Sequence, residues 1–211
     1  MSTDLLESPA ESSLAGRHRH TAVWVTMLVA SAASLVASFV LAIDALRLAE
    51  NPNLDLGCNI NAVISCGTVA GSWQASVLGF PNAFLGLVSE PVVITVAVAG
   101  LAGVRFPRWF MLLAQGFYLI GFAFAYWLFQ QAMFDIGALC PWCMLVTVAT
   151  TFVLFELTRI NILEGNLPLP ARAQAVLQQA VRLRVDILVL AVWLLLLVLA
   201  VVLRYGEALL A

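Results

Sequence analysis

Apolar residues are concentrated in five stretches of the chain, and polar residues collect in the segments between them. Four stretches reach the roughly 20 residues that an α-helix needs to cross a lipid bilayer. The last is shorter, but the flanking Asp186 and Arg204 can extend their charged groups to the membrane surface. The pattern therefore predicts an all-α protein with five transmembrane helices, at Thr21–Ile43, Phe84–Val104, Trp109–Phe134, Ile136–Phe155 and Ile187–Leu203.

Composition supports the same class. Hydrophobic residues occupy 63% and charged residues 10% of the 211 positions, whereas a soluble domain carries about 25% charged residues. The net charge of -2 favours no particular charged partner, and we expect no nucleic-acid binding.

The polar segments divide the chain into three expected parts. Residues 1–18 are interpreted as a disordered cytoplasmic tail. A signal peptide is the less favoured alternative, because the following apolar stretch is too long for one. Residues 19–160 form a four-helix core with a long loop at 44–82, and residues 161–211 add a linker and the fifth helix. Within the linker, 171–185 has apolar residues at helical spacing and predicts a basic amphipathic helix on the membrane surface.

The arginines predict the orientation of these helices. Cytoplasmic loops carry an excess of basic residues, and with five spans eight of the ten basic residues fall on one side. We therefore expect a cytoplasmic N-terminus and an extracytoplasmic C-terminus. The eight are Arg17, Arg19, Arg105, Arg108, Arg159, Arg172, Arg182 and Arg184, and the other two are Arg47 and Arg204.

All four cysteines are expected at the same membrane face. Cys58 and Cys66 lie in the loop after the first span, and Cys140 and Cys143 stand at the start of the fourth. Successive spans cross the membrane in opposite directions, so both cysteine pairs fall on the same side. The arginine distribution predicts that this side is extracytoplasmic, where disulfides persist.

The segment Cys140-Pro141-Trp142-Cys143 favours redox chemistry. A disulfide across two intervening residues closes a small ring and stabilises the fold little, so it suits opening and closing. Backbone N–H groups at a helix start also favour the thiolate of a cysteine there. Two alternatives are zinc binding, which the seven-residue spacing of the other pair disfavours, and two structural disulfides that only fasten the loop.

At this point the chain resembles the vitamin K epoxide reductase family, in its bacterial, actinobacterial type. The resemblance covers about residues 21–160 and is carried by the Cys58…Cys66 pair, Ser72, the Gly79-Phe80-Pro81-Asn82 segment leading into Gly86, and the later CPWC. The DsbB-type quinone reductases perform similar chemistry, but their CxxC pair comes first in the chain, and here that order is reversed.

The resemblance implies a bacterial inner-membrane location and a four-helix bundle around a quinone, with menaquinone favoured over ubiquinone. It implies that Cys58 and Cys66 take electrons from a thioredoxin-like, DsbA-like dithiol protein. Cys66 would pass them to Cys140, and Cys143 would face the quinone. Ser72 and Asn82 match polar positions tied to quinone binding or redox chemistry.

Some bacterial relatives carry a fused thioredoxin-like domain after the fifth span, whereas this chain ends at Ala211, so a separate partner is expected. Vertebrate enzymes have a tyrosine four residues after the second CxxC cysteine, and Thr147 stands there instead. A quinone-epoxide reductase and a non-enzymatic membrane protein remain alternative functions.

Two acidic residues lie in or near the predicted spans. Glu90 is a functional candidate because a carboxyl inside a bilayer is costly, and its alternative is a hydrogen bond to Gln115 or another interior polar group. Asp135, five residues before Cys140, is a candidate to influence the pKa of a thiol, but the favoured interpretation is that it marks the membrane interface.

Overall fold

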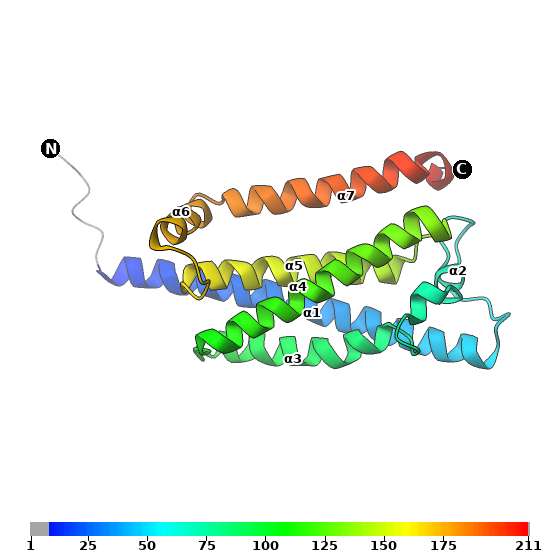
Figure 1. Cartoon of the computed structure of the whole chain (residues 1–211), viewed down its shortest axis with the longest axis horizontal. Helices are drawn as coiled ribbons and strands as arrows, with labels where there is room; N and C mark the ends of the chain where they lie inside the picture. The colour runs from blue at the N-terminus through cyan, green and yellow to red at the C-terminus, as the bar shows by residue number, and fades with distance from the viewer. Residues whose placement is uncertain (1–8, 211) are drawn as a thin grey trace.

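The computed structural model describes residues 9–210, with side chains over residues 21–206. Within that range the chain is a succession of helices joined by loops, of which the one between α1 and α2 is long (Figure 1). They are α1 (Pro9–Glu50), α2 (Cys66–Ala70), the 3₁₀-helix η1 (Trp73–Ser76), α3 (Ala83–Leu101), α4 (Arg108–Gln131), the π-helix η2 (Ala132–Ile136), α5 (Pro141–Leu163), α6 (Ala171–Arg182) and α7 (Val185–Leu210).

Five of these helices are long and apolar enough to cross a membrane, which confirms the predicted fold class. Helices α1, α3, α4 and α5 lie side by side as a bundle, and α7 runs along one side of it (Figure 1). The short α2 lies at the end of the bundle where α3 and α5 begin, and α6 lies at the opposite end.

The centre of the bundle is packed with apolar side chains from all four helices. Trp24 and Met27 of α1 are buried against Met111 of α4 and Val153 and Leu157 of α5. Small residues allow the helices to approach closely, as is common in membrane bundles. At Gly86 of α3, for example, a Cβ atom would collide with the side chain of Ser38 of α1.

Glu90 joins three helices of the bundle. It is 4% exposed, and its carboxyl group accepts hydrogen bonds from Ser34 of α1 at 2.9 Å and from Tyr118 of α4 at 3.1 and 3.3 Å. The expected hydrogen bond to an interior polar group is therefore confirmed, with Ser34 and Tyr118 as the partners; Gln115 is not one of them, because its amide donates to Thr158 of α5. Neighbouring helices thus provide the hydrogen-bond donors that the carboxyl group of Glu90 could not find in lipid.

The helix boundaries differ from prediction at the N-terminus. Helix α1 begins at Pro9, so residues 9–18 of the expected disordered tail are helical, and residues 1–8 lie outside the described residues. A helix that is already formed can be extended without a new nucleation cost. Polar residues can therefore continue a helix that the adjacent apolar segment has formed. The amphipathic segment is helical as expected, over Ala171–Arg182, and its position on the membrane surface stays a prediction.

Candidate functional site

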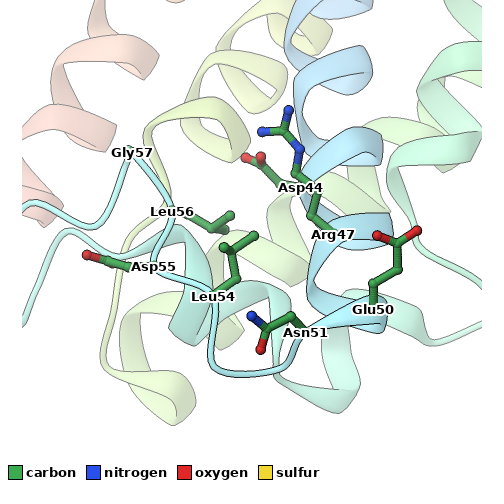
Figure 2. A pocket seen from close by; sticks show the side chains of 8 residues that line it. All are labelled: Asp44, Arg47, Glu50, Asn51, Leu54, Asp55, Leu56 and Gly57. Carbon is green, nitrogen blue, oxygen red and sulfur yellow. The ribbon is translucent and has the colours of Figure 1, made fainter.

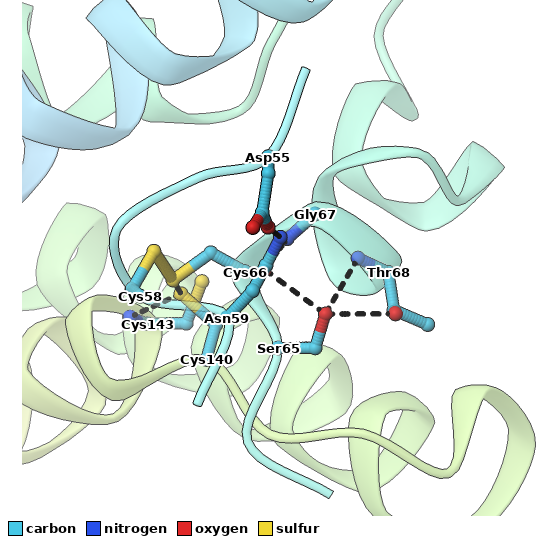
Figure 3. Close-up of a disulfide and its surroundings, with 9 residues drawn as sticks. All are labelled: Asp55, Cys58, Asn59, Ser65, Cys66, Gly67, Thr68, Cys140 and Cys143. Carbon is cyan, nitrogen blue, oxygen red and sulfur yellow. Dashed lines mark hydrogen bonds between the residues drawn. A yellow bond between two sulfur atoms is a disulfide. The ribbon is translucent and has the colours of Figure 1, made fainter. Parts of the chain in front are cut away.

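The four cysteines meet at one end of the bundle (Figure 3). Cys58 and Cys66 form a disulfide with a Cα–Cα distance of 5.6 Å, while Cys140 and Cys143 are free thiols. The Cys140 Sγ lies 3.4 Å from the Cys66 Sγ. Two cysteines that are 74 positions apart in the chain are therefore in contact, one from each pair.

Backbone hydrogen bonds fold the loop onto the segment before α5. The Asn61 side chain accepts from the N–H groups of Val63 and Ile64 at 2.9 and 2.7 Å, which makes a tight turn. Leu139 then donates to Val63 O at 2.7 Å and accepts from Ser65 N at 3.0 Å. These bonds fasten the residue before Cys66 to the residue before Cys140.

Side chains of the loop fix the helical turn that carries Cys66. Ser65 caps α2 by accepting from Thr68 N at 3.2 Å. The Asn59 side chain accepts from Gly67 N at 2.9 Å and donates to Asp55 at 2.8 Å. Both cysteines of the disulfide are thus flanked by hydrogen-bonded residues, as Figure 3 shows.

Cys66 and Cys140 lie in an apolar enclosure. They are 1% and 2% exposed and pack with Leu56, whereas Cys58 and Cys143 are half-buried. Because Cys140 stands at the N-cap position of α5, it receives hydrogen bonds from that helix start. The Cys143 side chain, together with the N–H groups of Cys143 and Trp142, lowers the pKa of Cys140 below its ordinary value, and burial opposes this shift.

The carboxyl group that acts on Cys140 comes from α1. The charge of Asp44 raises the pKa of Cys140, against the larger lowering effect of Cys143. Sequence reasoning considered Asp135 for this influence and missed Asp44. A signal was present, since Leu41, Asp44 and Leu48 share one helical face, and the two leucines pack on the cysteine enclosure.

Asn82 lies at the N-cap position of α3, but its side chain does not cap that helix. Its amide Nδ2 donates to Gln74 O at 2.6 Å, and its buried Oδ1 has no hydrogen-bond partner among the described residues. Gln74 in turn donates to Asp135 at 2.5 Å, which ties the loop to the end of α4 and η2. Sequence reasoning missed Gln74, a buried residue in η1.

Two hydroxyl groups near the candidate site are already engaged. Ser72 Oγ donates to Val69 O at 2.7 Å, which leaves its oxygen free only as an acceptor. Thr147 is buried one turn after Cys143 and donates to the Cys143 carbonyl at 3.0 Å.

The family model described as "Vitamin K epoxide reductase family" matches residues 25–158, which is more than half of the chain. The matched segment begins within α1 and ends within α5, so it contains both cysteine pairs and the loop between them. No curated protein matched the chain.

Proposed function

Because this chain belongs to the vitamin K epoxide reductase family, a quinone-linked redox family of multi-pass membrane proteins, we propose that it oxidises protein dithiols and reduces a membrane quinone. Its partner would be a separate thioredoxin-like, DsbA-like protein, which it would reoxidise for disulfide formation. Menaquinone is the proposed acceptor in preference to ubiquinone.

The 3.4 Å contact between Cys66 Sγ and Cys140 Sγ carries this proposal. Thiol–disulfide exchange proceeds when a thiolate attacks a disulfide sulfur and forms a mixed disulfide. The contact supports such exchange between the two pairs, because each sulfur is already beside its reaction partner. The lowered pKa of Cys140 makes its thiolate the better leaving group when the mixed disulfide between Cys66 and Cys140 is resolved.

The proposed relay has two exchanges. The partner's thiolate attacks Cys58, Cys66 leaves, and the partner's second thiol then releases the partner as a disulfide. Cys66 next attacks Cys140 of the oxidised inner pair and Cys143 leaves. Cys58 then attacks Cys66, which restores the Cys58–Cys66 disulfide and leaves Cys140 and Cys143 reduced. The redox state in the structure, with the outer pair bridged and the inner pair free, corresponds to the end of this sequence.

The polar groups near α3 fit a quinone. Asn82 has one amide N–H beyond the one given to Gln74, and its buried Oδ1 lacks a partner. A quinone carbonyl accepts hydrogen bonds and a quinol hydroxyl donates them, so this amide complements both forms. We propose that Asn82 orients the ring, with Ser72 as a further acceptor and Cys143 as the adjacent thiol. The quinone would supply a two-electron acceptor that also takes up two protons.

We also propose an orientation and a division of the chain. The N-terminus and α6 would face the cytoplasm and the cysteines the opposite side, residues 19–160 would form the catalytic core, and residues 161–211 would add the linker and fifth helix. After mild reduction, a membrane-impermeant maleimide should label Cys58 from the extracytoplasmic side of cells. Labelling of Cys58 only in inverted vesicles would contradict this orientation.

Turnover of purified protein tests the reaction itself. With added quinone, a reduced thioredoxin-like protein or dithiothreitol should be oxidised, and Cys140→Ala or Cys143→Ala should abolish quinone reduction. Comparing menaquinone with ubiquinone tests the acceptor, and Asn82→Ala should raise KM for the quinone. Folded protein that reduces neither quinone with any dithiol would refute the proposed function and favour disulfides that only fasten the loop.

A further inference from the structure

A hollow of about 360 Å³ lies between the end of α1 and the loop that leads to Cys58 (Figure 2). One wall is the last turns of α1, with Asp44, Arg47 and Glu50, and the other is the loop from Asn51 to Gly57. Gly57 directly precedes Cys58 in the chain. The lining of the hollow therefore ends at the residue before Cys58, the half-buried cysteine of the pair.

The hollow is acidic. Three carboxylates line it, from Asp44, Glu50 and Asp55, against the single guanidinium of Arg47, so its formal charge is 1 minus 3, or -2. Asp55 accepts a hydrogen bond from Asn59 at 2.8 Å. Arg47 forms no ion pair with these carboxylates within the described residues. The negative charge is therefore not neutralised from within the hollow.

Among the acidic residues of the hollow, Asp44 gives the strongest indication of a ligand. It is 9% exposed, and no hydrogen bond or ion pair to its carboxyl group occurs within the described part of the chain. Figure 2 shows this carboxyl group extending from α1 toward the loop at Leu56 and Gly57. Because Asp44 is otherwise covered by protein and lines the hollow, a cation entering the hollow would give its carboxylate a direct partner of opposite charge.

The accessibility of the two disulfide sulfurs indicates which molecule would bring such a cation. Cys66 is 1% exposed, so a protein thiol must attack Cys58. A partner cysteine placed at Cys58 brings its own neighbouring residues over Gly57 and the hollow. We propose that this hollow binds a lysine or arginine side chain beside the reacting cysteine of the dithiol partner, an inference that rests on the proposed function.

The chemical step at Cys58 is an exchange with no other reactant. The bond between Cys58 and Cys66 breaks, a bond between Cys58 and the partner's sulfur forms, and the partner's second thiol then displaces Cys58. Two electrons and the two thiol protons pass from the partner to Cys58 and Cys66. The hollow would act on the encounter that precedes this exchange and would leave the later transfer to Cys140 unchanged.

Two synthetic peptides test the charge preference with the full-length protein. Both carry two cysteines separated by two residues, flanked by lysines in one peptide and by glutamates in the other, and dithiothreitol serves as an uncharged reductant. The readout is the ratio of kcat/KM for the lysine peptide to that for the glutamate peptide, followed by quinone reduction. Steps that both peptides share cancel in this ratio, including any effect of Asp44 on Cys140.

We expect the lysine peptide to be favoured about fivefold at low ionic strength, as one or two partly exposed ion pairs allow, and less at high salt. Asp44→Asn, Glu50→Gln and Asp55→Asn should each lower the ratio, whereas Arg47→Gln should raise it. Glu164→Gln removes the same charge at the far end of α5 and should leave the ratio unchanged.

A ratio near one in the unaltered protein would overturn the proposal, as would a ratio that none of the hollow variants moves. Either result, obtained with normal dithiothreitol turnover, would leave the proposed function intact. Absence of quinone reduction with dithiothreitol would instead overturn the proposed function, and this inference with it.

Discussion

Replacing Cys58 and Cys143 together by alanine tests which sulfurs exchange between the two pairs. The variant leaves Cys66 and Cys140, whose Sγ atoms are 3.4 Å apart. A disulfide needs about 2.05 Å between its sulfurs, so the two side chains must close by about 1.4 Å. The backbone bonds from Leu139 to Val63 and Ser65 already fasten the loop in place. We therefore expect a Cys66–Cys140 bridge to form readily under mild oxidation.

The bridge should also stabilise the protein. It joins cysteines 74 positions apart, against 8 for the Cys58–Cys66 disulfide. Chain-entropy arithmetic gives about 4.5 kcal/mol for the longer closure and about 2.5 kcal/mol for the shorter one. The oxidised variant should therefore unfold at a higher denaturant concentration than its reduced form, with a free energy of unfolding larger by up to about 4.5 kcal/mol if little strain accompanies closure.

Mass spectrometry after maleimide treatment counts the free thiols. The matched control is the variant that replaces Cys58 and Cys140, which leaves Cys66 and Cys143 and should bridge much more slowly. Two free thiols at Cys66 and Cys140 under oxidising conditions would refute the proposed electron path. So would equally fast bridging in the control, because the contact would then have no selectivity.

Two further predictions concern the thiol chemistry and the bundle. Cys143→Ala should raise the pKa of Cys140, because it removes the contribution that lowers this pKa most. The ultraviolet absorbance of the Cys140 thiolate should therefore decrease at neutral pH, and the midpoint of its titration should move to higher pH. An unchanged midpoint would contradict this prediction. Ser34→Ala and Tyr118→Phe each remove one donor to Glu90 and should each lower the free energy of unfolding by about 0.6 kcal/mol, as interhelical bonds in membranes typically contribute. Detergent-induced unfolding measures this loss, and no loss in either variant would show that the Glu90 contacts contribute nothing.

The five helices were predictable because length and hydropathy alone determine whether a segment can cross a bilayer. Both cysteine pairs and their shared end of the bundle followed from their positions relative to those spans. The length of an apolar segment does not reveal whether the helix continues into the polar residues before it. The start of α1 at Pro9 was therefore not predicted.

The contacts that assemble the site were not predictable in the same way. The β-bridge between Ile64 and Leu139 consists of hydrogen bonds between backbone groups, which every sequence carries. It also joins two segments that are far apart in the chain. Gln74 binds Asp135 across a similar separation, so nothing in its local sequence distinguishes it from a surface glutamine. Asn82 was identified by resemblance, yet its unpartnered oxygen became apparent only in the folded chain.

The burial of Cys66 and Cys140 has a consequence for selectivity against small thiols. Glutathione is charged and water-soluble, so it cannot enter the apolar enclosure around Leu56 to reach Cys66 or Cys140. Of the two sulfurs of the disulfide, only that of Cys58 is accessible to reductants of the surrounding medium, and shape and charge can discriminate among them there. Under the proposed function, this discrimination would reserve the oxidised outer pair for the thiols of the dithiol partner.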